Sequence, residues 1–349
     1  MIYSLDISTG FQCNFRCNYC FEQKFKNAYT NTKPSNEVID RIIEYVKYLK
    51  KTILTSEEDY ISLTYYGGEP LLNLDLIERM ATALRGEQVK YSFATNGYLV
   101  KEKLDQILRI KQLSNNKMVF GFSYDFYLQD KNRKANTYKL IRDNIKLIYK
   151  LKIPTLVVAC VPYGDLKDFD KVFFDALDLK RQCTHTPMTF NVDRCKASKT
   201  DFNEEECIEG FTKVKNFLDT YGENDIIVYN NACGSADTRD SKCVYGHIYG
   251  GIDPEGNIYP ANNIIFYNNE YIKKSMYLGN VFEDFDILTE KRNKLIESLD
   301  FTRPIDCTTC NAPCRVFPWS TIVDDISQFN KMPSEEHCQV HKFMHKYLG

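Results

Sequence analysis

The chain has 349 residues, of which 43% are hydrophobic and 26% charged, and its formal net charge is −2. This composition is typical of a soluble globular protein of about two domains. With no basic block and no apolar run near ~20 residues, the sequence predicts neither a nucleic-acid surface nor a membrane span. Because the first residues lack a basic region and a long apolar core, we expect no secretory signal and a cytoplasmic protein. Thirteen cysteines in such a chain indicate metal ligation or catalysis rather than a disulfide scaffold.

From residue 1 to about residue 195, short β-branched or aromatic runs alternate with longer segments of helical spacing. The predicted strands are Ser4–Thr9, Tyr60–Tyr66, Lys90–Thr95, Met118–Tyr124, Thr155–Val161 and Thr189–Asp193. The predicted helices are Asn36–Lys51, Leu74–Arg85, Lys101–Leu113, Tyr138–Leu151, Leu166–Leu177 and Glu204–Thr220. Six βα units predict an α/β fold with a parallel sheet and outer helices, and fewer than eight units favour an open, partial (β/α)6 barrel of TIM type. Its active site would lie at the carboxyl ends of the strands.

After residue 222 this alternation stops. The segment Ile248–Ile258 reads IYGGIDPEGNI, in which Pro254 and Gly256 mark the turn of a hairpin. From Asp306 onward the sequence is loop-like and rich in cysteine, and it ends in an amphipathic helix near Glu335–Leu348. We therefore predict two domains, a barrel over residues 1–222 and a small, metal-stapled, cysteine-rich domain over residues 223–349.

Three cysteines stand in one short segment after the first predicted strand. Cys13, Cys17 and Cys20 have the spacing C-x3-C-x2-C. Thiolates held by a tight loop bind iron–sulfur clusters, and three of them leave one iron of a cubane open to a further ligand. A zinc site completed by a distant fourth ligand is the alternative.

The second predicted strand is followed directly by a GGEP segment made of Gly67, Gly68, Glu69 and Pro70. Glycines let backbone carbonyl groups approach a ligand closely, and the glutamate offers a carboxylate. Taken alone, the segment is also compatible with an ordinary Gly-Pro turn.

These two motifs resemble the radical S-adenosylmethionine (SAM) superfamily, whose signature C-x3-C-x-(aromatic)-C has Tyr19 in its aromatic position. The resemblance implies a [4Fe–4S] cluster on the three cysteines, with the open iron ligated by the amino and carboxylate groups of SAM. It also implies that the GGEP backbone and Glu69 bind the SAM ammonium group. The pair of motifs makes the zinc alternative for the triplet much less favourable.

The third predicted strand ends in Thr95 and Asn96, followed by Gly97, and members of this superfamily often carry TNG there. The resemblance implies a SAM-binding role for the threonine and asparagine. A polar turn with glycine in a left-handed conformation is the alternative.

The fourth predicted strand ends in FSYDF, which contains Ser123 and Asp125. Peptide-modifying members carry SLDG followed by DKNR at this place. Here Phe126 replaces the glycine, and Asp130–Arg133 supplies DKNR after a shorter gap. The resemblance implies that Ser123 contacts the SAM ribose and that Arg133 meets the SAM carboxylate, although an exposed salt bridge at a helix start is an alternative for Arg133.

The C-terminal cysteines resemble the SPASM/twitch extension found in this superfamily. The pattern is incomplete, because Ala261 stands where the cysteine of the hairpin is expected. The resemblance implies one auxiliary iron–sulfur cluster, and C-x2-C is also a zinc spacing, so a structural zinc site is the alternative. The candidate ligands are Cys307, Cys310, Cys314 and Cys338, with Cys243 able to replace one of them.

Two further cysteines are candidate hydrogen-atom donors to a substrate radical. Cys160 lies near the end of a predicted barrel strand, and Cys233 enters the second domain. Plain buried thiols are the alternative for both.

The resemblance implies an enzyme in which a reduced cluster cleaves SAM to a 5′-deoxyadenosyl radical that abstracts hydrogen from a peptide or small protein. Maturation of a ribosomal peptide precursor through a thioether or carbon–carbon cross-link is the favoured reaction, and peptide epimerisation is an alternative. The implied partner for electron transfer is a donor of the flavodoxin or ferredoxin type. Because Cys13 comes so early, the resemblance also implies either a separate leader-peptide-binding protein or a substrate held by the barrel's own surface. A zinc-stapled interaction protein is the alternative outside the enzyme class.

Overall fold

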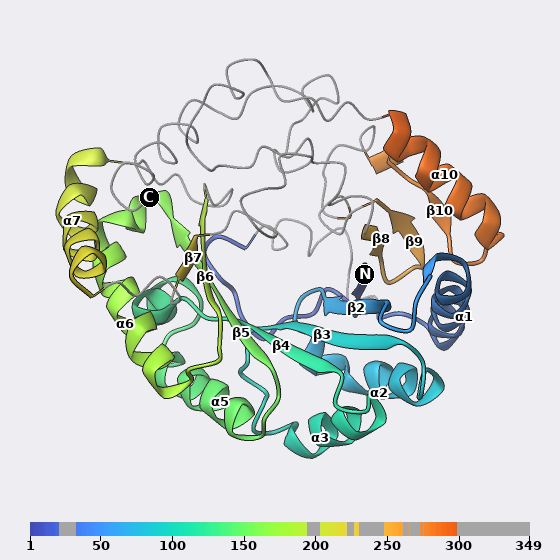
Figure 1. The fold of residues 1–349 in the computed structure, drawn as a ribbon, viewed down its shortest axis with the longest axis horizontal. Helices are drawn as coiled ribbons and strands as arrows, with labels where there is room; N and C mark the ends of the chain where they lie inside the picture. The colour runs from blue at the N-terminus through green and yellow to red at the C-terminus, as the bar shows by residue number, and fades with distance from the viewer. Residues whose placement is uncertain are drawn as a thin grey trace.

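The computed structural model describes residues 1–20, 33–193, 203–221, 227–229, 248–260, 265, 273–274 and 276–298. Within these residues, ten strands form one sheet in the order β10-β9-β8-β1-β2-β3-β4-β5-β6-β7. The neighbours from β8 to β7 run parallel, whereas β8–β9 and β9–β10 are antiparallel. Figure 1 shows the strands forming a curved sheet with the helices on its outer side. The predicted α/β class and partial barrel are therefore confirmed.

The strands are β1 (Ile2–Ser8), β2 (Tyr60–Tyr66), β3 (Val89–Thr95), β4 (Met118–Ser123), β5 (Thr155–Pro162), β6 (Met188–Asp193), β7 (Ile227–Tyr229), β8 (Ile248–Ile252), β9 (Asn257–Tyr259) and β10 (Gly279–Asn280). The α-helices are α1 (Asn36–Ile53), α2 (Leu74–Ala83), α3 (Leu104–Leu113), α4 (Gln129–Asn132), α5 (Tyr138–Lys150), α6 (Phe169–Gln182), α7 (Glu204–Tyr221) and α10 (Phe285–Ser298). Short 3₁₀ helices span Pro70–Asn73, Phe126–Leu128 and Tyr163–Asp168.

The six predicted βα units are all present, with differences mainly at their ends. The helix predicted over Leu166–Leu177 is wrong at both ends, because a 3₁₀ turn occupies Tyr163–Asp168 and α6 then continues to Gln182. The sequence did not predict β7, β10 or α10. The two strands have three and two residues, which is too short for an alternation to show.

The two faces of the sheet differ in chemistry. Alternate residues such as Leu5, Leu63 and Phe120 are fully buried and pack with the helices in the outer core. The half-buried residues between them point to the other side, which we call the lumen face. On β1 to β5 it includes Ser4, Asp6, Ser62, Thr64, Lys90, Ser92, Val119, Leu156, Val158 and Cys160.

The predicted hairpin after residue 247 is confirmed, with Gly251 opposite Tyr259 in the register of β8 and β9. Gly256 in its turn has φ of +85°, a conformation that favours glycine. The hairpin does not form a sheet of its own, because β8 pairs directly with β1. The boundary between residues 222 and 223 stays a prediction.

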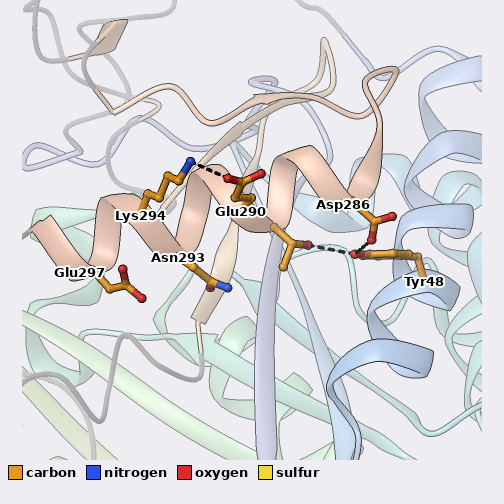
Figure 2. A pocket seen from close by; sticks show the side chains of 7 residues that line it. Tyr48, Asp286, Glu290, Asn293, Lys294 and Glu297 are labelled. Carbon is orange, nitrogen blue, oxygen red and sulfur yellow. Dashed lines mark hydrogen bonds and ion pairs between the residues drawn. The ribbon is translucent and has the colours of Figure 1, made fainter.

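Helix α10 packs against α1 on the outer side of the barrel. The Tyr48 hydroxyl donates to Asp286 Oδ1 over 2.6 Å, and Phe285 packs on the rings of Tyr45 and Tyr48. The solvent-exposed side of this contact is a hollow lined largely by charged side chains of α10, including Glu297 (Figure 2). In the part of the chain that the structure describes, no helix has the length and apolar character needed to cross a membrane.

Candidate active site at the carboxyl ends of the strands

The cysteine segment leaves β1 and is hydrogen-bonded to the GGEP segment that leaves β2. The Gly68 amide donates to the Gly10 carbonyl oxygen over 2.9 Å, and the Glu69 amide donates to the Gln12 carbonyl oxygen over 2.8 Å. These bonds continue the β1–β2 pairing beyond the strand ends. The backbone immediately before Cys13 is therefore fixed by the GGEP segment.

Gly67 and Gly68 make this close approach possible. A Cβ atom at Gly67 would lie 2.2 Å from the Gly10 carbonyl oxygen, and one at Gly68 would lie 2.0 Å from the Gln12 carbonyl oxygen. Gly67 also has φ of +125°, which side chains rarely allow. The glycines thus admit the backbone of the cysteine segment, while their predicted approach to a ligand stays a prediction.

Glu69 joins the GGEP segment to the loop after β3. Its carboxylate is 1% exposed and accepts hydrogen bonds from Leu71 N at 3.0 Å, Thr95 Oγ1 at 2.5 Å and Asn96 N at 2.8 Å. Pro70 follows it as the first residue of a 3₁₀ helix. Burial raises the pKa of the Glu69 carboxyl to about 7, and these donors act against that rise. A cationic ligand at this carboxylate would favour its ionised form.

Asn96 contacts the cysteine segment directly. Its Nδ2 donates to Asn14 Oδ1 over 2.8 Å and lies 3.9 Å from Cys13 Sγ. Gly97 has φ of +74°, so the polar turn with a left-handed glycine is present. The side chains of Glu69 and Asn96 therefore link the loops after β2 and β3 to Cys13.

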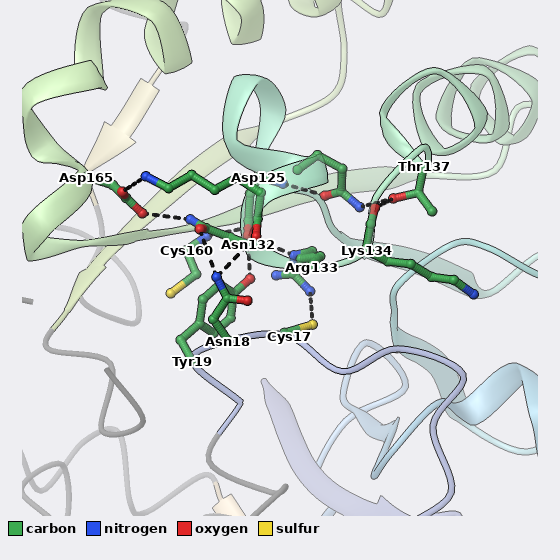
Figure 3. A network of polar contacts seen from close by, with 12 residues as sticks. Cys17, Asn18, Tyr19, Asp125, Asn132, Arg133, Lys134, Thr137, Cys160 and Asp165 are labelled. Carbon is green, nitrogen blue, oxygen red and sulfur yellow. Dashed lines mark hydrogen bonds and ion pairs between the residues drawn. The ribbon is translucent and has the colours of Figure 1, made fainter. Parts of the chain in front are cut away.

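A second network centres on Asp125, which follows β4 and is fully buried. Asp125 Oδ2 accepts a hydrogen bond from the Tyr19 hydroxyl over 2.5 Å and lies 3.0 Å from Arg133 Nε. Asp125 Oδ1 accepts from the Cys160 amide over 2.9 Å. Figure 3 shows these side chains converging beside Cys17. Burial raises the pKa of the Tyr19 hydroxyl well above its usual value, so Tyr19 acts as a hydrogen-bond donor here.

Arg133 does not form the exposed salt bridge that the sequence left open. Its side chain is 10% exposed, and its partner Asp125 is inaccessible to solvent. The guanidinium also lies 5.3 Å from the centre of the Tyr19 ring, and its Nη1 is 4.0 Å from Cys17 Sγ. Burial raises the pKa of the Cys17 thiol to about 11, and the Arg133 charge works in the opposite direction by stabilising a thiolate. The predicted contact of Arg133 with the SAM carboxylate stays a prediction.

Phe126 occupies the position at which the peptide-modifying members carry glycine. Its φ is +51°, a left-handed conformation that is costly for a bulky residue. Its buried ring packs against Tyr124 and Phe190, with ring centres 5.0 and 5.9 Å apart. Packing therefore holds a backbone turn that glycine would adopt without strain. Ser123, the preceding candidate, is half-buried at the end of β4.

A third group of residues, which the sequence analysis did not predict, holds the cysteine segment through Asn18. The Asn18 amide donates to the Asn132 carbonyl oxygen over 2.8 Å, and Asn132 Nδ2 donates to Asp165 Oδ2 over 2.8 Å. Lys131 Nζ also lies 2.5 Å from Asp165 Oδ1. The DKNR resemblance covered Asn132 and Lys131, whereas nothing local in the sequence marked Asp165.

The remaining candidates fall into two groups. Cys160 is half-buried on the lumen face of β5, next to the Asp125 network. The other candidate cysteines lie outside the described residues, and they are Cys233, Cys243, Cys307, Cys310, Cys314 and Cys338.

The donor set at the first site fits a cluster held by thiolates. The Phe15 amide donates to Cys13 Sγ over 3.4 Å, and Arg133 Nη1 lies 4.0 Å from Cys17 Sγ. Hydrogen-bond donors and positive charge around sulfur stabilise the thiolate form that iron requires. Within the described ranges, no three His, Cys, Asp or Glu side chains are already gathered at metal-binding distances. The chemistry of the ligands fits the cluster, and the last adjustment of the thiols would accompany its binding.

Comparison with known proteins agrees with these features. Residues 7–176 match the Radical SAM superfamily, whose members use a [4Fe–4S] cluster and SAM. A stretch of 73 residues is 30% identical to the radical SAM cyclopropyl synthase TigE of Paramaledivibacter caminithermalis, and the match spans 20% of this chain and 16% of TigE.

Two groups of solved structures share the fold. The chain is similar to anSMEcpe with bound AdoMet and Cp18Cys peptide, with a TM-score of 0.67 and 19% identity over 99% of this chain and 96% of that one. It is also similar to SuiB of Streptococcus suis bound to its precursor peptide SuiA, with a TM-score of 0.62 and 14% identity over 89% of this chain and 70% of that one. Residues 7–176, which contain the cysteine triplet and the GGEP segment, thus match the radical SAM superfamily.

Proposed function

We propose that this protein is a radical SAM enzyme that modifies a peptide or small protein. The observation that carries the proposal is the fixed cysteine segment, with Cys13 and Cys17 held between the Glu69–Asn96 and Asp125–Arg133 networks. When bound, the [4Fe–4S] cluster and SAM supply a 5′-deoxyadenosyl radical that abstracts a hydrogen atom from the substrate.

The chain's own residues bind and orient SAM in this proposal. The Glu69 carboxylate receives the SAM ammonium group beside the backbone of Gly67, Gly68 and Pro70. Arg133 receives the SAM carboxylate, and Ser123 contacts the ribose. Thr95 and Asn96 complete the pocket and keep Glu69 in place through the bonds described above. Tyr19 and Asp125 hold the cysteine segment against the strand ends.

A peptide substrate is supported by the fold neighbours, because anSMEcpe and SuiB were both solved with a bound peptide. In our proposal the reaction matures a ribosomal precursor by forming a thioether or carbon–carbon cross-link, and epimerisation is the second candidate within the same chemistry. Cys307, Cys310, Cys314 and Cys338 are the proposed ligands of one auxiliary iron–sulfur cluster, and Cys243 is the proposed replacement for one of them. A flavodoxin or ferredoxin would supply the electron, and a separate protein would bind the leader peptide.

Anaerobic reconstitution tests the cofactor content directly. We expect a brown protein with about eight irons and eight sulfides per chain, since each of two cubanes holds four of each. With SAM and dithionite it should release 5′-deoxyadenosine and methionine. A colourless protein that holds zinc and leaves SAM intact would overturn the proposed function. A content near twelve irons would show that a second auxiliary cluster is present.

The Glu69→Gln variant tests the proposed contact with the SAM ammonium group. A charge-assisted hydrogen bond contributes about 1.5–3 kcal/mol, so the affinity for SAM should fall by about tenfold or more. Equilibrium dialysis with labelled SAM measures the effect on the reconstituted protein. Glu37→Gln, which removes an equal charge from the exposed first turn of α1, should bind SAM normally. Unchanged affinity in Glu69→Gln would show that this carboxylate serves only to hold the loops after β2 and β3.

A further inference from the structure

The lumen face of the sheet is divided into two walls. On β1 to β3 it is polar, with Ser4, Asp6, Ser62, Thr64 and Ser92 half-buried in adjacent positions. On β4 and β5, three of the half-buried positions carry aliphatic residues, Val119, Leu156 and Val158, which form the apolar wall. Gly121, Ser123 and Cys160 occupy the other half-buried positions of these two strands. A barrel interior filled only to form a core would carry bulky aliphatic residues on all of its strands. The polar wall therefore needs an explanation other than packing.

Asp6 is the carboxylate of the polar wall. Its register partner on β2 is Thr64, and its partner on β8 is Gly251, which has no side chain. Ser4 Oγ donates to Asp6 Oδ1 over 3.3 Å, and the Thr64 side chain is also hydrogen-bonded to the carboxylate. Hydroxyl groups stabilise a buried carboxylate less than a cation does, and burial accordingly raises the pKa of Asp6 to about 6.

Lys90 is a cationic side chain on the same wall, but it is not positioned to neutralise Asp6. The Lys90 ammonium lies 5.5 Å from the centre of the Tyr60 ring, and its register neighbour is Ser62, two residues before Thr64 along β2. It thus belongs to the amino-terminal end of the strands, whereas Asp6 lies nearer their carboxyl ends. The neighbourhood of Asp6 is suited to a cation that comes from a ligand.

A second, independent observation points to a ligand in the same space. Ser8 follows Asp6 by two residues on β1, so it lies on the same face and about 6–7 Å closer to the cysteine segment. Ser8 is fully buried beside Gly67, and its Oγ has no hydrogen-bond partner among the residues that the structure describes. A buried hydroxyl is normally satisfied, and leaving it unsatisfied costs about 1–3 kcal/mol. A polar group of a bound substrate would satisfy it.

We infer that the lumen binds a lysine or arginine side chain of the peptide substrate, with its charged head at Asp6 and its methylene stem on the apolar wall. This inference rests on the proposed function and adds the class of side chain that the site selects. Lysine and arginine combine a long apolar stem with a cationic head, which matches the two walls. Asp6 thereby acts as a specificity-determining residue for substrate binding.

Dye-labelled, amidated short peptide pools test the inference on the reconstituted protein with SAM and without reductant. Each pool fixes one central residue as Lys, Arg, Gln, Glu or Leu and contains no other charged residue. Fluorescence anisotropy should show the Lys and Arg pools binding at least about tenfold more tightly than the Leu pool, as a desolvated charge pair allows. In Asp6→Asn this preference should fall to within about twofold.

Control variants distinguish binding at Asp6 from a general effect of lost negative charge and from misfolding. Glu297→Gln removes an equal charge from the exposed side of α10 and should keep the full preference. Asp6→Asn and the smaller Asp6→Ser are compared after confirming that SAM binding and thermal midpoint match the wild type, and the two should lose the preference together. A wild type without preference for Lys or Arg, or a variant that keeps the preference, overturns the inference while leaving a peptide substrate in place. If no pool binds to the wild type, the peptide class itself is wrong and the inference falls with it.

Discussion

Replacing Cys13, Cys17 and Cys20 together by Ala should abolish reductive cleavage of SAM. No thiolate would remain to hold a cubane with one iron facing SAM. 5′-Deoxyadenosine formation should fall to the level of the protein-free control, measured by chromatography after anaerobic incubation with SAM and dithionite. Iron content should fall to about half, because the proposed C-terminal cluster stays in place.

The matched control uses cysteines that lie in the core. Cys183 and Cys207 are almost fully buried and belong to no polar network described above, so replacing both by Ala should leave iron content and SAM cleavage intact. Undiminished 5′-deoxyadenosine formation by the triple variant would remove the cluster from the first site. A triple variant with no iron and one bound zinc would instead show that the C-terminal domain is a zinc module.

Gly68→Ala should impair the site nearly as strongly without replacing a proposed cluster ligand. Its new Cβ would lie 2.0 Å from the Gln12 carbonyl oxygen, so the cysteine segment must move away from the GGEP segment. A displacement near ~1 Å at a positioned group costs about 100-fold in rate, and we expect a loss of that size in SAM cleavage. Thermal unfolding should report a stability loss of about 1–3 kcal/mol, typical of overpacking.

Gly86→Ala is the matched control for Gly68→Ala. Gly86 has φ of +84°, and its added Cβ would have no atom within 4 Å, so the substitution strains the backbone without crowding any neighbour. It should cost about 1 kcal/mol in stability and leave iron content and SAM cleavage unchanged. Equal activity losses in the two variants would mean that general instability, and not the fit of the cysteine segment, explains the result.

The sequence predicted the barrel well because its elements are long and periodic. Six strands of six to eight residues alternate with amphipathic helices, and Ser35 caps α1 as its side chain accepts a hydrogen bond from the Val38 amide. The start of α6 was misplaced because Leu166 has helical spacing yet lies in a 3₁₀ turn that precedes the helix. Apolar spacing does not distinguish these two helical forms.

The networks behind the cysteine segment could not be predicted in the same way. Tyr19 and Asp125 are 106 residues apart, and only the curved sheet brings them together. Both residues lie in motifs that carry the resemblance, and the structure shows them hydrogen-bonded to each other. The resemblance explained Gly67 and Gly68 by a close approach to SAM. The structure adds a second reason, because the backbone of the cysteine segment leaves no room for a Cβ atom at either position.

The position of β1 in the sheet has a consequence for the order in which the protein is completed. β1 is flanked by β2 on one side and by β8 on the other, and β8 begins only at Ile248. At about 5–20 residues per second, a nascent chain carries β1 for more than about ten seconds before its second neighbour has been synthesised. During that time β1 has an open edge, and the cysteine segment leaves a strand that is paired on one side only. The cysteine segment, although synthesised early, is therefore completed late, and we expect cluster insertion to follow the synthesis of β8.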